Sequence, residues 1–141
     1  MNKMLVAVDG SKYSDKALFK ARKIAEGINS EVTILHVINP LRDTVYINNR
    51  ELANEIKKNA SMRGDQIIRK AQEIFEGFNG VMVTETRLGD AVDEIIKFAE
   101  EGGFDLIVLG SRGGGVFSRA LLGSVSDKVV HHIKTSVLIV K

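Results

Sequence analysis

Short apolar runs alternate along the chain with longer segments in which apolar residues recur every three or four positions. Several of the short runs are β-branched and apolar at successive positions, as in parallel strands that are covered on both faces. We therefore predict five buried strands, at Met4 to Val8, Val32 to Ile38, Val81 to Leu88, Leu106 to Leu109 and Val137 to Val140.

The segments between these runs have the period of amphipathic helices, and they carry start and stop signals. Serine and aspartate stand at starts, where they cap free N–H groups, and glycine stands near two of the ends. The predicted helices run from Ser14, as N-cap, to about Gly27; from about Glu51 to Phe78; from Asp90, as N-cap, to Gly102; and from near Ser124 through Ile133.

This alternation predicts an α/β domain with a parallel sheet and right-handed crossovers. A length of 141 residues fits one domain, so residues 1–141 are expected to form a single domain. The longest predicted helix has one apolar face that includes Leu52, Ile56, Ala60, Ile67, Ala71, Ile74 and Phe78. An irregular stretch from Asn39 to about Arg50 precedes that helix, and it is either a binding loop or a mobile connection.

Composition excludes several classes of protein. The chain has 20 Lys and Arg against 18 Asp and Glu, and this even balance argues against a nucleic-acid partner. It has no cysteine, which excludes disulfides and thiolate chemistry. No apolar run approaches the ~20 residues of a membrane span, and the first apolar run is too short for a secretory signal. We therefore expect a soluble cytoplasmic protein without a membrane partner.

A glycine-rich loop is the first candidate for chemistry. Gly110 ends the fourth predicted strand, Ser111-Arg112-Gly113-Gly114-Gly115 follows, and Gly123-Ser124 opens the last helix. Backbone N–H groups and a helix dipole at such a junction favour phosphate, and the hydroxyls of Ser124 and Ser126 add donors. The loop does not fit the Walker A pattern or the dinucleotide fingerprint. By itself it is equally compatible with a flexible surface turn.

The turn after the first strand is the second candidate. Asp9 stands at the carboxyl end of that strand and is followed by Gly10-Ser11. An acidic side chain there suits paired ribose hydroxyls, although a simple turn or helix cap explains it as well. In an open doubly wound sheet, ligands bind where the strand order reverses, at the carboxyl ends. If the first and fourth strands are neighbours there, Asp9 and the Gly110 loop face one crevice.

Together these motifs resemble the ATP-binding branch of the universal stress protein family. Gly110-Ser111-Arg112-Gly113, nine residues and Gly123-Ser124 match its Gly-x2-Gly-x9-Gly-Ser/Thr pattern. The opening from Met4 to Ser11, the second strand, the turn at Gly89-Asp90-Ala91 and the closing strand are also similar. The resemblance implies a Rossmann-like, open five-stranded parallel sheet in the order 3-2-1-4-5 with helices on both faces. It also implies ATP between the first and fourth strands and a homodimer.

Carried over residue by residue, the resemblance implies that Asp9 holds the ribose and that the Val37 backbone contacts adenine. It implies that the phosphates lie on the glycines and on the start of the last helix. The candidate nucleotide-binding residues are Asp9, Gly10, Ser11, Val37, Gly110, Arg112, Gly113, Gly123, Ser124, Val125 and Ser126. Many members have His where this chain has Arg112, which either contacts phosphate or projects into solvent. Many also have proline where this chain has Ser136.

No residue set predicts catalysis or a metal site. His36 is interpreted as a hydrogen-bonded core residue, and His131-His132 as cations at the end of the last helix. Asp9 is expected at the ribose, and Asp127 is as well placed to interact with the helix dipole as with a nucleotide. We therefore expect no catalytic residue and at most slow ATP hydrolysis.

The closing strand predicts self-association. Ser136 to Lys141 is short, apolar, free of proline and last in the chain, so it is expected at a sheet edge. An uncovered edge pairs readily with a second copy, which predicts a two-fold homodimer through Val137 to Val140.

The leading hypothesis is an ATP-binding regulatory or stress-response protein that acts as a nucleotide-dependent switch. ADP or AMP as the resident nucleotide, and Mg²⁺ or Mn²⁺ as its companion, are left open. One alternative is an ATP-hydrolysing or adenylyl-transfer enzyme, although the Ser-Gly-Gly-x-Asp-Ser signature of adenylating pyrophosphatases is absent. The other is a dimeric interaction module without a ligand.

Overall fold

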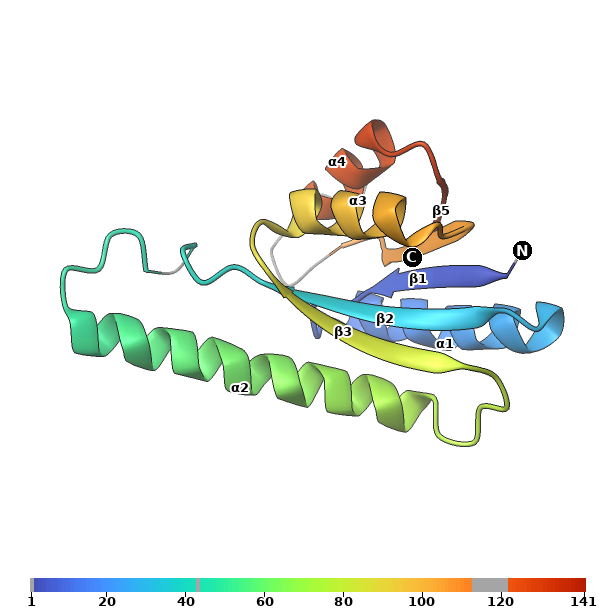
Figure 1. Cartoon of the computed structure of the whole chain (residues 1–141), viewed down its shortest axis with the longest axis horizontal. Helices are drawn as coiled ribbons and strands as arrows, with labels where there is room; N and C mark the ends of the chain where they lie inside the picture. The colour runs from blue at the N-terminus through green and yellow to red at the C-terminus, as the bar shows by residue number, and fades with distance from the viewer. Residues whose placement is uncertain (1, 43, 113–121) are drawn as a thin grey trace.

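The computed structural model describes residues 2–42, 44–112 and 122–141, and the fold is an α/β sandwich of helices around one sheet (Figure 1). Strands and helices alternate along the whole chain, as the sequence pattern predicts. The elements are β1 (Lys3–Ala7), α1 (Lys12–Ile28), β2 (Glu31–Ile38), α2 (Arg50–Ile74), β3 (Met82–Leu88), α3 (Ala91–Gly102), β4 (Leu106–Gly110), α4 (Ser124–His132) and β5 (Ser136–Val140).

The sheet has the order β3-β2-β1-β4-β5, and every neighbouring pair is parallel. Helices α1 and α2 cover one face, and α3 and α4 cover the other (Figure 1). The predicted five-stranded, Rossmann-like α/β fold is therefore confirmed. The order in which strands are added reverses at β1: β2 and β3 lie on one side of it, and β4 and β5 on the other. An open sheet of this kind forms a crevice at that point.

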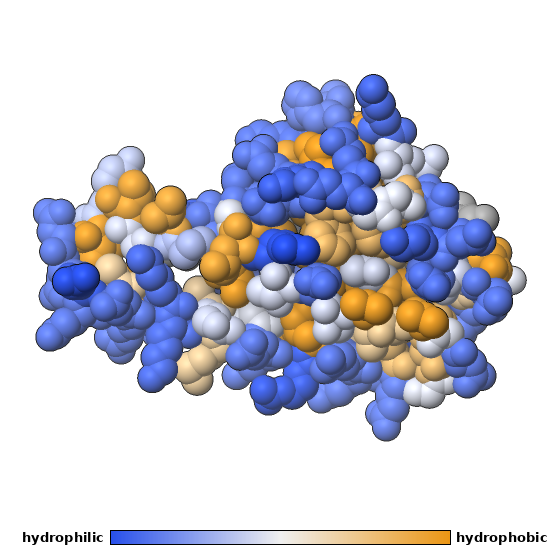
Figure 2. Space-filling model, viewed as in Figure 1, coloured by the Kyte–Doolittle hydropathy of each residue, from blue (hydrophilic) through white to orange (hydrophobic). Residues whose placement is uncertain are grey.

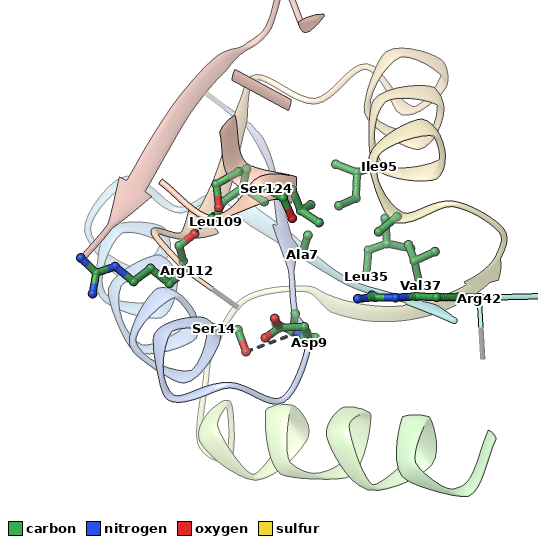
Figure 3. A pocket seen from close by; sticks show the side chains of 16 residues that line it. Ala7, Asp9, Ser14, Leu35, Val37, Arg42, Ile95, Leu109, Arg112 and Ser124 are labelled. Carbon is green, nitrogen blue, oxygen red and sulfur yellow. Dashed lines mark hydrogen bonds between the residues drawn. The ribbon is translucent and has the colours of Figure 1, made fainter. Parts of the chain in front are cut away.

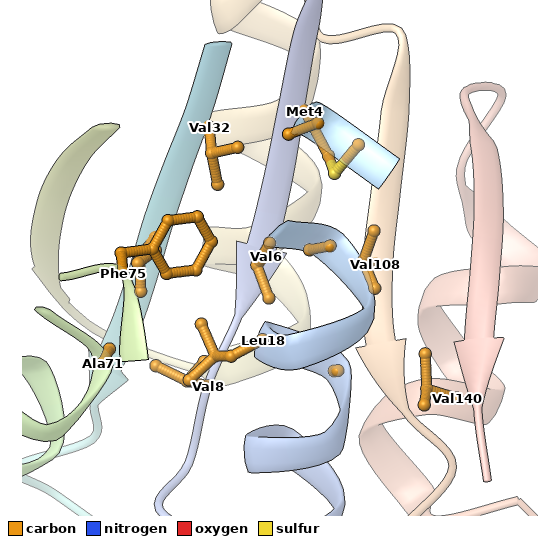
Figure 4. Close-up of a cluster of buried hydrophobic side chains, with 13 residues drawn as sticks. Met4, Val6, Val8, Leu18, Val32, Ala71, Phe75, Val108 and Val140 are labelled. Atoms are coloured by element: carbon orange, nitrogen blue, oxygen red, sulfur yellow. The ribbon is translucent and has the colours of Figure 1, made fainter. Parts of the chain in front are cut away.

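The central strand β1 is buried on both faces. Met4 and Val6 face α1 and α2, where they pack with Leu18 and Phe75 (Figure 4). Leu5 faces the opposite way and belongs to the cluster of α3 and α4. Full burial of such a side chain stabilises the fold by about 1.5–3 kcal/mol. The uninterrupted apolar run in β1 is therefore explained by its central place in the sheet.

The strand register brings distant turns together. Val6 of β1 pairs with Ile34 of β2 on one side and with Val108 of β4 on the other. Because these strands are parallel, their carboxyl ends lie at the same edge of the sheet. The turn that begins at Asp9 is therefore held beside the end of β4.

The N-cap of α1 is Ser11, so the prediction of Ser14 is wrong. Ser11 has extended backbone angles, and its hydroxyl accepts a hydrogen bond from the N–H of Ser14 at 3.2 Å. Ser14 is buried in the first turn and donates its hydroxyl to the carbonyl of Ser11 at 3.1 Å. Both residues are serines at a helix start, and only the backbone conformation distinguishes the cap from the first turn. The prediction of Asp90 as the cap of α3 is confirmed.

Helix α2 ends at Ile74, before the predicted end at Phe78, and only its second half packs against the sheet. Gly64 and Ala71 are its buried residues, whereas Leu52 is 43% exposed. The first half projects past the end of the sheet together with the loop that precedes it (Figure 1). Figure 2 shows apolar residues at the surface of this projecting part, where Leu41 and Val45 are exposed. The continuous apolar face predicted for this helix is therefore buried over only part of its length.

Gly64 marks the crossing of α2 over the end of β2. A Cβ at this position would lie 3.0 Å from the Cδ1 of Ile38 and 3.2 Å from the Cδ2 of His36. The His36 ring is buried, and its Nδ1 lies 2.8 Å from the carbonyl oxygen of Val8. The interpretation of His36 as a hydrogen-bonded core residue is therefore confirmed.

Two further observations concern the segments around the sheet. The stretch 39–49 between β2 and α2 contains neither helix nor strand in its described residues, as predicted. Across the described ranges, no helix is both long enough and apolar enough to cross a membrane.

Candidate functional site

A cavity of about 210 Å³ opens at the carboxyl ends of β1, β2 and β4 (Figure 3). The turn after β1 and the start of α4 both border it, so the two motifs found in the sequence meet over one hollow as predicted. Its described lining consists of residues from the strand ends, from the following loops and from three helices: Ala7, Val8, Asp9, Ser14, Leu35, Val37, Arg42, Ala91, Ile95, Leu109, Gly110, Arg112, Gly123, Ser124, Val125 and Ser126.

Asp9 forms a turn and also borders the cavity. Its Oδ1 accepts a hydrogen bond from the N–H of Ser11 at 2.9 Å, as in an Asx-turn. Within the described part of the chain, its Oδ2 accepts no hydrogen bond, and the residue is exposed. The turn therefore fixes the orientation of the carboxylate while one oxygen is left for a ligand.

Gly10 and Ser11 do not line this cavity. Gly10 has a φ of +83°, and a Cβ there would lie 3.0 Å from the Cγ1 of Ile67 on α2. Ser11 is the N-cap of α1. Both residues shape the turn that presents Asp9, and a direct contact of either with a ligand stays a prediction.

The end of β4 approaches the first turn of α1 so closely that only glycine fits at position 110. A Cβ at Gly110 would lie 2.7 Å from the carbonyl carbon of Tyr13 in the first turn of α1. Backbone atoms cannot yield as the end of a flexible side chain can. The glycine therefore allows α1 to start against the end of β4, independently of any ligand.

The start of α4 is tied to the end of β4 by two short hydrogen bonds. The N–H of Gly123 donates to the carbonyl of Ser111 at 2.7 Å, and the hydroxyl of Ser126 donates to the carbonyl of Gly110 at 2.7 Å. The second bond uses the hydroxyl proton that the sequence analysis assigned to phosphate. Ser126 therefore offers its backbone N–H to the cavity rather than a hydroxyl donor.

The first turn of α4 has the electrostatics of an anion site. Ser124, Val125 and Ser126 line the cavity, and the first N–H groups of a helix have no acceptor within that helix. The N-cap is Gly123, which supplies no side-chain acceptor for them. These N–H groups and the positive end of the helix dipole therefore favour a negatively charged ligand group at this end of the cavity.

The opposite end of the cavity is apolar. Leu35 and Val37 of β2 lie there with Ile95 of α3 (Figure 3). Val37 is half-buried, and Leu35 and Ile95 are buried. The cavity therefore has an apolar end and an anion-binding end, with Asp9 on its wall, and this suits a ligand with an apolar ring and a charged tail.

Two arginines border the cavity in opposite orientations. The guanidinium of Arg112 lies over the ring of Tyr13 at 5.8 Å, and Figure 3 shows its side chain directed away from the cavity. Arg42 extends toward Val37 and the interior (Figure 3). The sequence analysis missed Arg42, and the only available signal was its position in the loop just after β2.

Gly113, also predicted to bind phosphate, lies outside the described residues.

Asp127 does not line the cavity. Its carboxylate Oδ1 lies 3.5 Å from the Nδ1 of His131, one turn further along α4. His131 and His132 end this helix, as predicted. In the described ranges, no group of three or more His, Asp or Glu residues is placed to hold a metal ion. Asp9 is therefore the single carboxylate in the described lining of the cavity.

Comparison with known proteins identifies relatives along the whole chain. The model of the "Universal stress protein family" matches residues 1–141. The universal stress protein YxiE of Bacillus subtilis (strain 168) is 38% identical over 150 aligned residues, and the match covers 99% of each chain. The structure of the universal stress protein UspA from Lactobacillus plantarum is similar with a TM-score of 0.86 and 25% identity, over 99% of this chain and 97% of that one.

A further solved structure carries a ligand. It is a universal stress protein in complex with cAMP, with a TM-score of 0.70 and 26% identity to this chain. The similarity covers 99% of this chain and 96% of the other.

Proposed function

Because the chain belongs to the universal stress protein family, we propose that it binds an adenine nucleotide in this cavity and acts as a nucleotide-dependent switch in a stress response. The observation that carries the proposal is the set of groups that border one cavity. An apolar end, the carboxylate of Asp9 and the N–H groups at the start of α4 offer partners for the base, the ribose and the phosphates of a nucleotide. The related structure that holds cAMP supports the choice of adenine.

In this proposal the base lies against the apolar end, where the backbone of Val37 contacts adenine. The carboxylate of Asp9 accepts hydrogen bonds from the ribose hydroxyls. The hydrogen bond from Ser11 to its Oδ1 holds the carboxylate in place, and its Oδ2 faces the ligand. The phosphates lie on the N–H groups of Ser124, Val125 and Ser126 and on the glycines Gly110, Gly113 and Gly123. ATP is the proposed ligand, and ADP and AMP present the same base, ribose and first phosphate.

The described lining favours binding over rapid turnover. Phosphoryl transfer needs carboxylates that hold a metal and a group that positions the attacking nucleophile. Asp9 lies at the proposed ribose position, and Asp127 faces His131. Mg²⁺ or Mn²⁺ would accompany the nucleotide mainly through its phosphate oxygens, since Mg²⁺ commonly binds through substrate phosphates. We therefore propose slow hydrolysis at most, and no catalytic residue.

We also propose that two copies associate through β5. This strand is at the edge of the sheet, next to β4, as the sequence analysis predicted. Among the described strands only β4 pairs with β5, and an edge strand of this kind can pair with a second β5 by two-fold symmetry. We further propose that residues 1–141 act as one nucleotide-binding domain in the cytoplasm, without a nucleic-acid or membrane partner.

The proposal is tested on the purified chain. Denaturing freshly purified protein and chromatographing the released small molecules should yield an adenine nucleotide. Adding ATP at ~100 times its dissociation constant should stabilise the folded protein by roughly 2.7 kcal/mol, which a thermal shift detects. Absence of both signals would refute nucleotide binding. A steady ATP turnover within the usual enzyme range of about 1–1000 per second would favour the enzymatic alternative.

Asp9→Asn is the sharpest variant for the ribose contact. The asparagine oxygen can still accept the hydrogen bond from Ser11, so the turn is kept while the charge is removed. A hydrogen bond to a charged group contributes about 1.5–3 kcal/mol, so the affinity should fall about 10- to 100-fold. Asp93→Asn, at an exposed position of α3 that does not line the cavity, is the matched control, and it should leave the affinity unchanged.

A further inference from the structure

We propose that Arg42 stacks its guanidinium on the bound base and so contributes to base recognition by the cavity. The inference rests on the proposed nucleotide site. It adds Arg42, which is not part of the glycine-rich pattern, to the residues of that site. Arg42 lies in the loop after β2, outside both motifs found in the sequence, and lines the cavity. The inference follows from how this loop is held, from the end of the cavity it reaches, and from the chemistry of a guanidinium.

The loop is held in a defined turn by Asn39. The side-chain Oδ1 of Asn39 accepts hydrogen bonds from the N–H groups of Leu41, at 3.2 Å, and Arg42, at 3.1 Å. Thr44 is buried, and its hydroxyl donates to the carbonyl of Pro40 at 2.6 Å. These bonds fix the backbone of Arg42 just beyond the end of β2. The position of Arg42 at the cavity is therefore set by the fold and not by its long side chain alone.

Arg42 reaches the apolar end of the cavity. Figure 3 shows its side chain beside Val37 and directed inward, on the side of Leu35. Ser124 and Arg112 lie away from Arg42, where α4 begins (Figure 3). A group at the apolar end faces the base of a nucleotide whose phosphates lie on α4. The location of Arg42 therefore favours a contact with the base over a contact with the phosphates.

A planar guanidinium suits that position. It stacks on aromatic faces, and it gives up its hydration more readily than the ammonium group of lysine does. Stacking of this kind contributes about 0.5–2 kcal/mol, depending on how far water is excluded. The base would then contact the guanidinium of Arg42 in addition to apolar side chains such as Val37. Arg42 is exposed in the structure, so its side chain can approach a ligand without displacing core residues.

The contact would also link the site to the projecting part of the molecule. The loop that carries Arg42 continues into the exposed first half of α2. A base that holds Arg42 therefore restrains the start of this segment. The amide hydrogens of the loop should exchange more slowly with solvent when nucleotide is bound, and Arg42→Ala should reduce that protection.

The test compares ligands with and without phosphates. The affinities of adenosine and of ATP are measured for the wild type and for Arg42→Ala by calorimetry. We expect Arg42→Ala to weaken both ligands by the same factor, about 2- to 30-fold. Arg42→Lys should restore less than half of the lost free energy of binding, because lysine keeps the charge but lacks the planar group.

Two controls separate this proposal from the proposed function. Arg50→Ala removes an exposed arginine at the start of α2 that does not line the cavity, and it should change neither affinity. Unchanged melting of the variants without ligand would show that they fold. Loss of ATP affinity with unchanged adenosine affinity would overturn the proposal, because Arg42 would then contact phosphate. Unchanged affinity for both ligands would overturn it too, while a wild type that binds neither would refute the nucleotide site itself.

Discussion

The hydroxyl of Ser126 donates a 2.7 Å hydrogen bond to the carbonyl oxygen of Gly110, and this bond joins the first turn of α4 to the end of β4. Ser126 is buried, and Ser126→Ala removes the donor of this part-buried hydrogen bond, at a cost of about 0.5–1.5 kcal/mol. The start of α4 would also shift from its place beside the cavity. We expect Ser126→Ala to lower both the free energy of unfolding and the affinity for ATP.

Ser124→Ala is the comparison for this variant. Ser124 is exposed and lines the same cavity, and no described residue hydrogen-bonds to its hydroxyl. Its removal should therefore weaken ATP binding and leave the midpoint of urea unfolding unchanged. If Ser126→Ala left the midpoint unchanged as well, the bond to Gly110 would have no structural role.

Gly110→Ala should destabilise the fold even without nucleotide. The new Cβ would lie 2.7 Å from the carbonyl carbon of Tyr13, so either α1 or β4 must move. Overpacking of this kind costs typically about 1–3 kcal/mol. Gly27→Ala is the matched control in α1, because nothing lies within 4 Å of its added Cβ. Helix propensity predicts that Gly27→Ala stabilises the protein by up to about 1 kcal/mol. Thermal unfolding should therefore show a lower midpoint for Gly110→Ala and an equal or higher one for Gly27→Ala.

Asp105 contributes a pH-dependent part of the stability at the other end of β1. Its Oδ2 accepts hydrogen bonds from the N–H groups of Asn2 and Lys3, at 2.9 and 3.0 Å. These two donors lower the pKa of Asp105 because they favour the carboxylate. A lowered pKa in the folded state stabilises the protein above the ordinary aspartate value of about 4. This contribution is lost as the pH falls through the lowered pKa.

Asp105→Asn should therefore be less stable than the wild type at pH 7, and the difference should shrink as the pH falls below about 4. Urea unfolding at a series of pH values measures it. Asp65→Asn, at an exposed position of α2, should follow the wild type throughout. A difference for Asp105→Asn that stayed constant down to the most acid pH would contradict the assignment.

The proposed dimer predicts different results for the two edges of the sheet. The wild type should sediment as a dimer at micromolar concentration. Ser136→Lys places a charge at an exposed position of β5 and should yield monomers, because an edge lysine opposes strand pairing. Val83→Lys places the same charge on β3, at the opposite edge, where Val83 is 45% exposed. This second variant should leave the dimer intact. If both variants were monomers, or if both were dimers, the result would argue against β5 as the interface.

Several elements could be predicted because their signals are local. The apolar runs of β1 and β4 indicate strands buried on both faces, and Asp90 is recognisable as a cap of α3 from its neighbours alone. The sheet order came from the resemblance of the whole chain, not from periodicity. Asp9 and Gly110 stood out because the carboxyl ends of neighbouring parallel strands meet at one edge.

Other features depend on contacts between distant segments. Ser11 and Ser14 are equally good caps by composition, and the backbone angles decide for Ser11. The role of Gly110 against Tyr13 depends on how closely α1 approaches β4. The hydroxyl of Ser126 looked like a phosphate donor, but the fold supplies a nearer acceptor in Gly110.

By itself, the amino-acid sequence determined the alternation of strands and helices and the two turns that carry glycine and aspartate, because periodicity and turn chemistry act between near neighbours. Tertiary structure alone decided where the apolar face of α2 leaves the sheet, so that Leu52 is exposed and Ala71 buried. It also decided that Arg42, and not only the glycine-rich loop, borders the cavity. Burial and cavity lining depend on which remote segments come into contact, and patterns between near neighbours in the sequence do not determine those contacts.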